Sequence, residues 1–312
     1  MGVGEPVGER PALICIVGPT ASGKSRLALD LAERYQGEII SADSVQIYRH
    51  FDIGSGKPTP QERQRIPHHL IDCADPGEDW DASVFAERAR AAVRAVRARG
   101  KLPLVCGGTF LWVRALVYGL VPAPPKDERV RQRHQQFVAQ YGRAALHARL
   151  REIDPASFER LMPNDFVRVS RALEVHELTG RPLSEMQREH GFRVPGSRVN
   201  FLGVHHEAES LAQRIRQRVQ QMLEAGWIEE VARLDAAGYG HTRPMRSVGY
   251  RQVLETLKTQ SPPSRDELAD EITRVTRIFA RRQRTWLREQ PVTWLNEQES
   301  QQFEVPSAWL AE

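Results

Sequence analysis

GPTASGKS, residues Gly18 to Ser25, is the stretch of this sequence that decides its fold. It matches the pattern G-x-x-x-x-G-K-[ST], in which backbone N–H groups of a loop and of the following helix converge on phosphate oxygens. The apolar run ALICIV (12–17) precedes it, and SRLALDLAER (25–34), with one apolar helical face, follows it. The sequence therefore predicts a buried strand, a phosphate-binding loop and a helix in direct succession.

Strand and helix patterns continue to alternate after this loop. Strand candidates are Glu38–Ser41, His69–Ile71 and residues 102–108 (LPLVCGG), whereas residues 82–100 have the spacing of an Ala-rich amphipathic helix. Such alternation is typical of an α/β domain with a parallel sheet. We therefore predict an α/β fold.

The character of the chain changes at residues 121–128, VPAPPKDE, where three prolines in four residues break any regular element. From there to about Asn200 the sequence is polar, helical in pattern and poor in strands. We expect residues 1–121 and 200–312 to form a core, and residues 122–199 to form an all-helical insertion.

A strand pattern returns at residues 200–206, NFLGVHH, and is expected to rejoin the sheet. Two long helices are predicted to follow, over roughly 207–236 and 265–289. The sequence RSVGYR (246–251) is expected in the loop between them.

Composition limits the cellular setting of the chain, which has 312 residues and a net charge of +4. It contains no run approaching the ~18 apolar residues of a membrane span. The first twelve residues lack the basic flank and apolar stretch of a signal peptide, and are expected to form a short lead-in. The sparse cysteines, Cys15, Cys73 and Cys106, are typical of buried thiols in a reducing compartment, without zinc spacing. We therefore expect a cytoplasmic protein without a structural zinc site.

The phosphate compound bound by the loop is a separate question. An ATPase or GTPase normally adds a carboxylate after a second buried strand to hold Mg²⁺. LPLVCGGT (102–109) ends in glycines instead, and the run before Asp72 is very short. These features argue against a nucleoside or nucleotide kinase that uses ATP, but this function stays an alternative.

Residues 41–58, SADSVQIYRHFDIGSGKP, form the second informative stretch. Asp43 follows a strand that should neighbour the first strand, so its carboxylate is expected at the carboxyl edge of the sheet beside the loop. A helix cap or a turn is the alternative role for a lone acid there. The mixture of Asp43 with Ser44, Gln46 and Tyr48 favours a ligand-binding surface.

The last predicted helix carries a basic stripe. At ~100° per residue its arginines fall within an arc of about 80°, with the apolar residues largely on the opposite side, expected in the core. The arginines are Arg274, Arg277, Arg281, Arg284 and Arg288, and the apolar residues are Ile272, Val275, Ile278, Phe279 and Trp286. A solvated charged face is the usual alternative, but a stripe beside a phosphate site favours binding of a polyanion.

Seven stretches together resemble the bacterial tRNA dimethylallyltransferases, in the same order from about residue 12 to residue 290. They are GPTASGKS, ADSVQIYRHFDIGSGKP, HHLID, LVCGGTFLW, NDFVRVSRALEV, SVGYRQ and TRIFARRQRTWLR. The resemblance implies a P-loop NTPase-like core. It also implies transfer of a dimethylallyl group from dimethylallyl diphosphate to the exocyclic amine of the adenosine 3′-adjacent to the anticodon, releasing diphosphate. Trp112 stands where the family usually has tyrosine, and is expected to alter the wall of the prenyl pocket.

The resemblance and the loop pattern assign roles to individual residues. Asp43 would be the general base, with Thr20 and Thr109 facing the reacting centre and Thr109 near the bridging oxygen of the diphosphate. Ser25 would hold Mg²⁺, the expected cofactor. The diphosphate would be bound by Gly18, Pro19, Thr20, Ala21, Ser22, Gly23, Lys24 and Ser25.

The expected RNA partner is the tRNA anticodon stem-loop, gripped between insertion and core by a monomer, with the target adenine everted into a channel through the core. A non-catalytic RNA-binding module with a relic loop is the second alternative. The residues predicted to contact tRNA are Asp43, Ser44, Val45, Gln46, Arg131, Val167, Arg168, Val169, Ser170, Arg171, Arg246, Ser247, Val248, Gly249, Tyr250, Arg251, Arg281, Arg282, Gln283, Arg284, Trp286 and Arg288.

Overall fold

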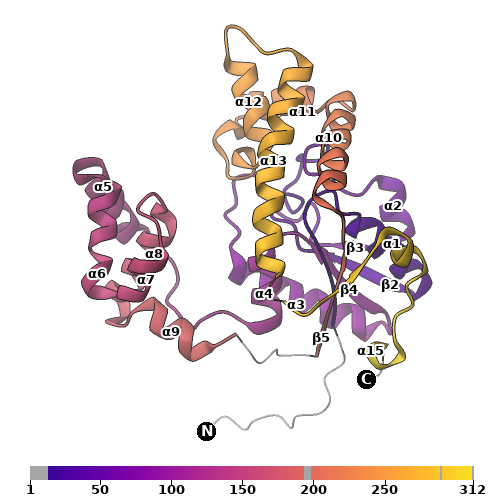
Figure 1. Ribbon diagram of the computed structural model, residues 1–312, viewed down its shortest axis with the longest axis horizontal. Helices are drawn as coiled ribbons and strands as arrows, with labels where there is room; N and C mark the ends of the chain where they lie inside the picture. Colours follow the sequence, from indigo (N-terminus) through magenta and orange to yellow (C-terminus); the bar gives the residue numbers. More distant parts are fainter. Residues whose placement is uncertain (1–12, 193–197, 289, 311–312) are drawn as a thin grey trace. The chain divides into compact units, whose positions relative to one another are not determined.

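The computed structural model describes residues 13–192, 198–288 and 290–310, so the predicted lead-in over residues 1–12 lies outside the described residues (Figure 1). The chain divides into two compact units. The core unit comprises Met1–Val117 and Ser197–Glu312, and the helical unit comprises Tyr118–Gly196.

A parallel sheet forms the centre of the core unit. Among the described residues its six strands follow the order β3-β2-β4-β1-β5-β6, with β1 between β4 and β5, and every pairing is parallel. This is the α/β architecture that the alternating patterns predict. The strands are β1 (Leu13–Val17), β2 (Gly37–Ser41), β3 (His68–His69), β4 (Leu102–Gly107), β5 (Val199–Val204) and β6 (Val292–Leu295).

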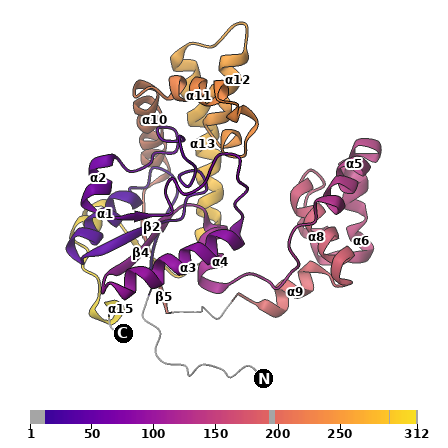
Figure 2. The same ribbon diagram turned by 180° about the vertical axis from the view of Figure 1, so that it is seen from behind.

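Helices surround this sheet, and α10 and α13 lie side by side in both views (Figures 1 and 2). None of the helices in the described part of the chain is long and apolar enough to cross a membrane. The core unit contains α1 (Lys24–Arg34), α2 (Pro60–Arg65), α3 (Ala82–Ala98), α4 (Phe110–Tyr118, ending at the boundary), α10 (Ala208–Glu224), α11 (Trp227–Ala236), α12 (Tyr250–Lys258), α13 (Arg265–Leu287), α14 (Glu297–Gln302) and α15 (Ser307–Leu310), with 3-10 turns at Tyr239–His241 and Pro244–Arg246.

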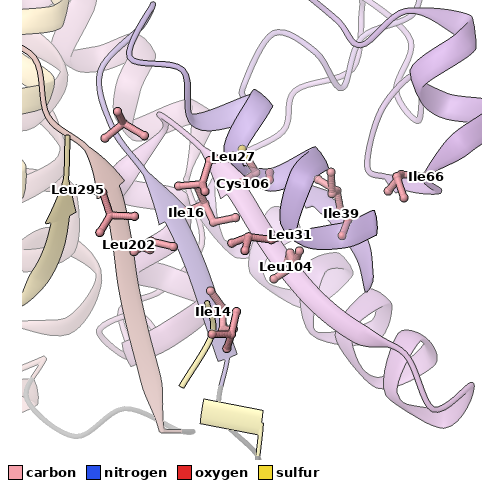
Figure 3. Packing of buried hydrophobic residues seen from close by; sticks show 14 residues of the cluster. Ile14, Ile16, Leu27, Leu31, Ile39, Ile66, Leu104, Cys106, Leu202 and Leu295 are labelled. Carbon is pink, nitrogen blue, oxygen red and sulfur yellow. The ribbon is translucent and has the colours of Figure 1, made fainter. Parts of the chain in front are cut away.

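Both faces of the central strand are buried. Ile14 and Ile16 belong to a cluster with Leu27 and Leu31 of α1, which Figure 3 shows next to Leu104. The alternate residues of β1, Cys15 and Val17, are also buried, as expected for a parallel strand covered on both sides. The rigid sheet fixes the end of β1, from which the phosphate loop begins.

Two predictions for the segment after β5 are wrong. The expected single helix over 207–236 is broken between α10 and α11, because Gly226 adopts the left-handed backbone conformation with φ 97°. RSVGYR is not simply a loop, since Arg246 ends a 3-10 turn and Tyr250 begins α12.

The apolar face predicted for α13 also needs correction. Ile272 is buried, but Ile278 and Phe279 are 38% and 40% exposed. The buried positions are partly polar, since Gln283 and Thr273 lie inside the core unit. Hydrophobicity alone misplaces this face because a cavity, described below, adjoins the helix at Phe279.

Smaller corrections concern β3 and the cysteines. β3 has two residues, and the positive φ angles of Leu70 (61°) and Asp72 (53°) end it earlier than predicted. The three cysteines are free thiols, but Cys73 is exposed rather than buried, because it follows this irregular turn. The edge strand β6 was not predicted at all.

The helical unit has its own small core, formed by residues such as Leu146, Leu150 and Leu173. Its longest helix, α5, is interrupted at Gly142, where φ is 82°. The unit contains α5 (Glu128–Ala148), α6 (Leu150–Ile153), α7 (Pro155–Arg160), α8 (Phe166–Thr179) and α9 (Leu183–His190). Every regular element in the described part of this unit, residues 118–192, is a helix.

Candidate active site

The phosphate loop occupies the turn between β1 and α1. Gly23 begins α1 with φ 85°, a left-handed conformation that a side chain would strain. Lys24 donates from Nζ to the Pro19 carbonyl at 3.2 Å, and burial lowers its pKa. The next residue, Ser25, is exposed at the start of the helix. The loop therefore presents a helix N-terminus and a partly desolvated cation to one ligand position.

Gln283 of α13 connects this loop to the end of β4. The Thr20 amide donates to Gln283 Oε1 at 2.9 Å, and Gln283 Nε2 donates to the Gly108 carbonyl at 2.9 Å. Since the Gln283 side chain is buried, these bonds are shielded from water. Gln283 thus positions the loop relative to the end of β4.

Two further side chains hold the loop from other elements. Arg214 of α10 donates from Nε to the Ala21 carbonyl at 3.1 Å. His206, two residues after β5, donates from Nε2 to the Ser22 carbonyl at 3.0 Å. These contacts satisfy two carbonyl groups of the loop and connect it to α10 and to the end of β5.

Asp43 and Thr109 follow the ends of β2 and β4, which pair with each other. The prediction that the strand before Asp43 neighbours the first strand is wrong, because β4 lies between β2 and β1. Asp43 Oδ1 accepts from the amides of Val45 at 2.9 Å and Gln46 at 3.3 Å, forming an Asx turn. Thr109 Oγ1 accepts from the Ser44 amide at 3.1 Å. The turn interpretation of Asp43 is therefore correct for one carboxylate oxygen, and the same residue also lines the cavity that adjoins the loop.

This cavity has a volume of about 1010 Å³ and lies wholly within the core unit. It brings together Thr20, Lys24, Ser25, Asp43 and Thr109. Residues 44–46 and 246–248, two of the stretches predicted to bind RNA, line it as well. One cavity thus joins the predicted phosphate-binding, catalytic and RNA-binding residues.

Two cations in this cavity were missed by sequence reasoning. Arg214 and Arg218 are one turn apart on α10, and both line the cavity. Burial lowers the pKa of Arg218, while the charge of Asp43 opposes that shift. The only sequence signal was their i, i+4 spacing on an amphipathic helix, which does not reveal what the helix faces.

Gly56 shows how tightly the cavity wall is packed around these cations. Its φ is 61°, and a Cβ there would lie 2.0 Å from an Arg218 guanidinium nitrogen. The arginine therefore passes directly over the turn at residues 52–57.

Asp72 is the acid that would favour an ATP-dependent enzyme, but its carboxylate forms ion pairs with Lys57 and Arg63. Lys57 Nζ lies 2.5 Å from Asp72 Oδ1, and Arg63 donates to Asp72 Oδ2 at 2.7 Å. These hydrogen bonds lower the pKa of Asp72 although burial opposes them. The carboxylate thus stabilises a turn and does not line the cavity.

Glu230 of α11 anchors the cavity wall that contains Asp52–Gly54. Its carboxylate accepts from the amides of Asp52 at 3.1 Å and Ile53 at 2.7 Å, and from the Tyr250 hydroxyl at 2.6 Å. Burial raises the pKa of Tyr250, so this hydroxyl stays a donor. No local pattern in the sequence predicted this buried carboxylate.

The residues predicted to contact RNA fall into two groups. Exposed or cavity-lining members include Arg246, Arg281, Arg282 and Arg288. The side chains of Val169, Ser170 and Tyr250 are instead buried inside their units. The prediction of direct side-chain contact is therefore corrected for these residues, because polarity and proximity to arginine do not report burial.

Trp286 and Gly249, two other residues predicted to contact RNA, lie close to aromatic side chains of the core unit. Trp286 stacks on Phe110 with ring centroids 6.1 Å apart, and the Arg114 guanidinium lies 5.3 Å from its ring. Gly249 precedes α12, with φ 90°, and a Cβ there would lie 2.2 Å from Trp227. Arg251 is exposed beside them, 3.8 Å from Glu255.

In the helical unit, Glu174 gathers two of the predicted RNA-binding arginines. Arg131 donates to it at 3.0 Å and Arg171 at 2.6 Å. Arg168 is exposed and pairs with Asp165, whereas Val167 is 69% exposed. Val167 and Arg168 are therefore the accessible members of this stretch.

Trp112 does not reach the cavity. It is buried and stacks on Phe85 of α3 with ring centroids 4.6 Å apart. Its ring lies in the packing between α3 and α4, so an effect of Trp112 on the prenyl pocket stays a prediction.

The chain matches two protein-family models. The family model "IPP transferase" matches residues 46–290, and the model "Isopentenyl transferase" matches residues 11–73. A tRNA dimethylallyltransferase from Sorangium cellulosum is 57% identical over 283 residues, which cover 91% of this chain and 90% of that protein. One from Geobacter sulfurreducens is 42% identical over 94% of both chains.

Solved structures show the same similarity. The tRNA isopentenylpyrophosphate transferase of Bacillus halodurans superposes with a TM-score of 0.67 at 36% identity, covering 92% of this chain and 90% of that one. A eukaryotic dimethylallyltransferase acting on tRNA gives a TM-score of 0.75 at 26% identity, covering 92% and 74%.

Proposed function

Since this chain belongs to the IPP transferase family and transfers a dimethylallyl group to tRNA, we propose how its residues perform that transfer. The donor is dimethylallyl diphosphate, and its diphosphate binds to the Gly18–Ser25 loop. The acceptor is the exocyclic amine of the adenosine 3′-adjacent to the anticodon. The observation that supports this most is the single cavity shared by the loop, Asp43, Thr109 and two arginines.

Departure of the diphosphate is the step that requires the loop. An adenine amine is a poor nucleophile, so the allylic carbon–oxygen bond must weaken as the carbon–nitrogen bond forms. The electron pair of the breaking bond passes to the diphosphate oxygen, and the loop amides, Lys24, Arg214 and Arg218 stabilise the negative charge that develops there. Thr20 and Thr109 face the reacting centre from the loop and from the start of α4.

Asp43 accepts the proton that the amine loses. One of its oxygens is fixed by the Val45 and Gln46 amides, which orients the carboxylate within the cavity. A carboxylate suffices as the base, because the amine becomes strongly acidic once alkylation begins. Thr109 keeps the adjacent Ser44 amide in place and so fixes the strand end that carries Asp43.

The donor set at the loop fits Mg²⁺. Mg²⁺ in phosphate sites keeps several waters and takes few protein oxygens, besides the phosphate oxygens themselves. The exposed Ser25 hydroxyl and the Asp43 carboxylate line the cavity, and the described residues contain no denser cluster of metal ligands. Ser25 would hold the ion, which when bound adds charge neutralisation at the diphosphate.

RNA binding is attributed to exposed arginines in each unit. In the core unit these are Arg246 at the cavity, Arg281 and Arg282 on α13, and Arg288 at its C-cap. In the helical unit Arg168 is the exposed arginine among those predicted to contact RNA. Their charge suits the phosphates of an anticodon stem-loop. The target adenine must leave its stack to meet Asp43, as bases do in enzymes that modify them.

A transfer assay tests this proposal. An unmodified anticodon stem-loop is incubated with Mg²⁺ and dimethylallyl diphosphate, and the RNA is analysed by mass spectrometry. We expect one dimethylallyl group on the adenosine 3′ of the anticodon, with diphosphate released and no need for ATP. A product only with ATP, or a group at another nucleotide, would contradict it.

A further inference from the structure

A second, smaller cavity adjoins the phosphate loop at Pro19. Its volume is about 150 Å³, and its walls are Pro19 of the loop, the end of β5, the last turns of α13, and Trp294 of β6. None of its lining residues lines the larger cavity, so it is a separate site. Pockets for whole small molecules are usually larger, ≈ 300–1,000 Å³, so this one suits a single flat ring.

Trp294 is held flat by a glycine on the neighbouring strand. Trp294 pairs with Gly203 in the β5–β6 register, and a Cβ at Gly203 would lie 2.7 Å from the indole ring. His205 meets the same ring edge-on, with centroids 6.4 Å apart and planes at 80°. Although tryptophan is strongly apolar, Trp294 remains 40% exposed. The strand pair thus presents an aromatic platform at the cavity.

Positive charge adjoins this platform. Arg284 lies in the last turn of α13 and Arg288, four residues later, is its C-cap; both line the small cavity. They also continue the exposed arginine stripe that includes Arg277 and Arg281. An aromatic ring for stacking, next to paired guanidinium groups for a phosphate, is the chemistry that recognises an unpaired nucleotide.

We propose that the small cavity binds one unpaired nucleotide of the acceptor RNA, different from the adenosine that is modified. The base stacks on Trp294 and meets His205 edge-on, and its phosphate lies on Arg284 and Arg288. The inference rests on the proposed function, because the RNA is the acceptor of that reaction. The modified adenosine occupies the larger cavity beside Asp43, so two cavities that both adjoin the phosphate loop hold two nucleotides.

The test measures the affinity of protein variants for a series of altered RNAs, so that the effects of a protein change and an RNA change can be compared. Affinity is measured by fluorescence anisotropy for an anticodon stem-loop and for a series in which each loop nucleotide in turn is abasic. Trp294→Ala should bind the intact stem-loop about tenfold more weakly, about 1.4 kcal/mol at 25 °C, as expected for loss of one stacked base. One abasic RNA of the series should bind Trp294→Ala and the unsubstituted protein equally. Trp294→Phe should retain most of the affinity.

Controls separate folding from recognition. Trp309→Ala removes a tryptophan that packs near Phe303 in the C-terminal segment, and should leave RNA affinity unchanged. Donor binding and the thermal midpoint of Trp294→Ala should match the unsubstituted protein. If that variant unfolds, Arg288→Gln takes its place, with the same expected loss and the same abasic position.

The outcomes also distinguish this inference from the function on which it rests. Unchanged affinity in Trp294→Ala and Arg288→Gln, or a tenfold loss that persists with every abasic RNA, would overturn the nucleotide site while prenyl transfer by the unsubstituted protein continues. Absence of prenyl transfer by the unsubstituted protein would instead overturn the proposed function.

Discussion

The side-chain oxygen of Gln283 lies 2.9 Å from the backbone nitrogen of Thr20, although 263 positions separate the two residues in the sequence. The same amide group donates to Gly108, so one side chain from α13 spans the phosphate loop and the end of β4. The helix proposed to bind RNA is therefore in direct contact with the loop proposed to bind the donor. Order in the loop depends on the position of that helix.

Gln283→Ala should make the Gly18–Ser25 loop less ordered, because its hydrogen bond to Thr20 is lost. We expect the KM for the donor to rise and kcat to fall about tenfold, since a buried amide and carbonyl lose their partner. RNA affinity should stay within twofold, because the side chain is buried. Steady-state transfer kinetics and anisotropy measure the two effects, and Gln260→Ala, an exposed glutamine after α12, is the matched control. A loss confined to RNA affinity would show that Gln283 contacts RNA instead.

Asp43→Asn should abolish turnover while preserving the turn. Asparagine keeps an Oδ1 acceptor for the Val45 and Gln46 amides, but it cannot take the amine proton. We expect kcat at least 100-fold lower, with RNA affinity unchanged. Single-turnover transfer of labelled donor measures the rate. Turnover near that of the unsubstituted protein would exclude Asp43 as the base, and unchanged turnover in Asp43→Ala would favour a non-catalytic role.

Arg218→Gln should weaken stabilisation of the departing diphosphate. The expected loss in kcat is roughly 100-fold, as for removal of one donor at a developing negative charge. Arg216→Gln is the matched control, because Arg216 is on the same helix but pairs with Asp270 at 2.6 Å outside the cavity. Equal effects of the two substitutions on kcat would argue for a general effect of charge on α10.

The arginines along α13 should contribute unequally to RNA binding. Arg281→Ala should make the plot of log RNA affinity against log salt concentration less steep, by the amount expected for loss of about one phosphate contact. Arg274→Ala should have a smaller effect, because Arg274 makes two 2.8 Å hydrogen bonds to Glu271 that compensate its charge. Affinity measured at several salt concentrations gives the two slopes. Identical slopes for both variants would contradict an RNA contact by Arg281.

Glu174 should make the helical unit sensitive to acid. Burial alone would raise its pKa, but hydrogen bonds from Arg131, Arg171 and the Asp127 amide lower it below the ordinary 4.5. Because the folded-state pKa is depressed, this stabilisation is present above about pH 4.5 and is lost as the pH falls through the folded-state pKa.

Glu174→Gln should therefore destabilise the helical unit near neutral pH by about 3 kcal/mol, because two arginines lose their buried partner. Hydrogen exchange at pH 7 should accelerate in α5 and α8 but not in α1. The difference in thermal midpoint between variant and unsubstituted protein, followed by circular dichroism, should narrow below pH 4. The exposed Glu152→Gln is the control, and a difference that grows in acid would contradict this account.

The sequence predicts the parts of this protein that depend on local rules. The Gly18–Ser25 pattern, its flanking strand and helix, and the strand end carrying Asp43 were all recognisable, because phosphate binding requires a fixed local geometry. Arg218 and Glu230 were not, since their roles depend on which surface α10 and α11 bring to the cavity. Burial of Tyr250 was missed for the same reason.

Trp227 restricts which changes the cavity wall can accept during evolution. A methyl group at Gly54 would lie 1.9 Å from the indole nitrogen, and one at Gly249 would lie 2.2 Å from the opposite end of the ring system. A larger residue at either position therefore requires the Trp227 side chain to move or to be replaced. Because both glycines meet the same indole, mutations at 54 and 249 depend on residue 227, and a smaller side chain at 227 would make both replacements easier.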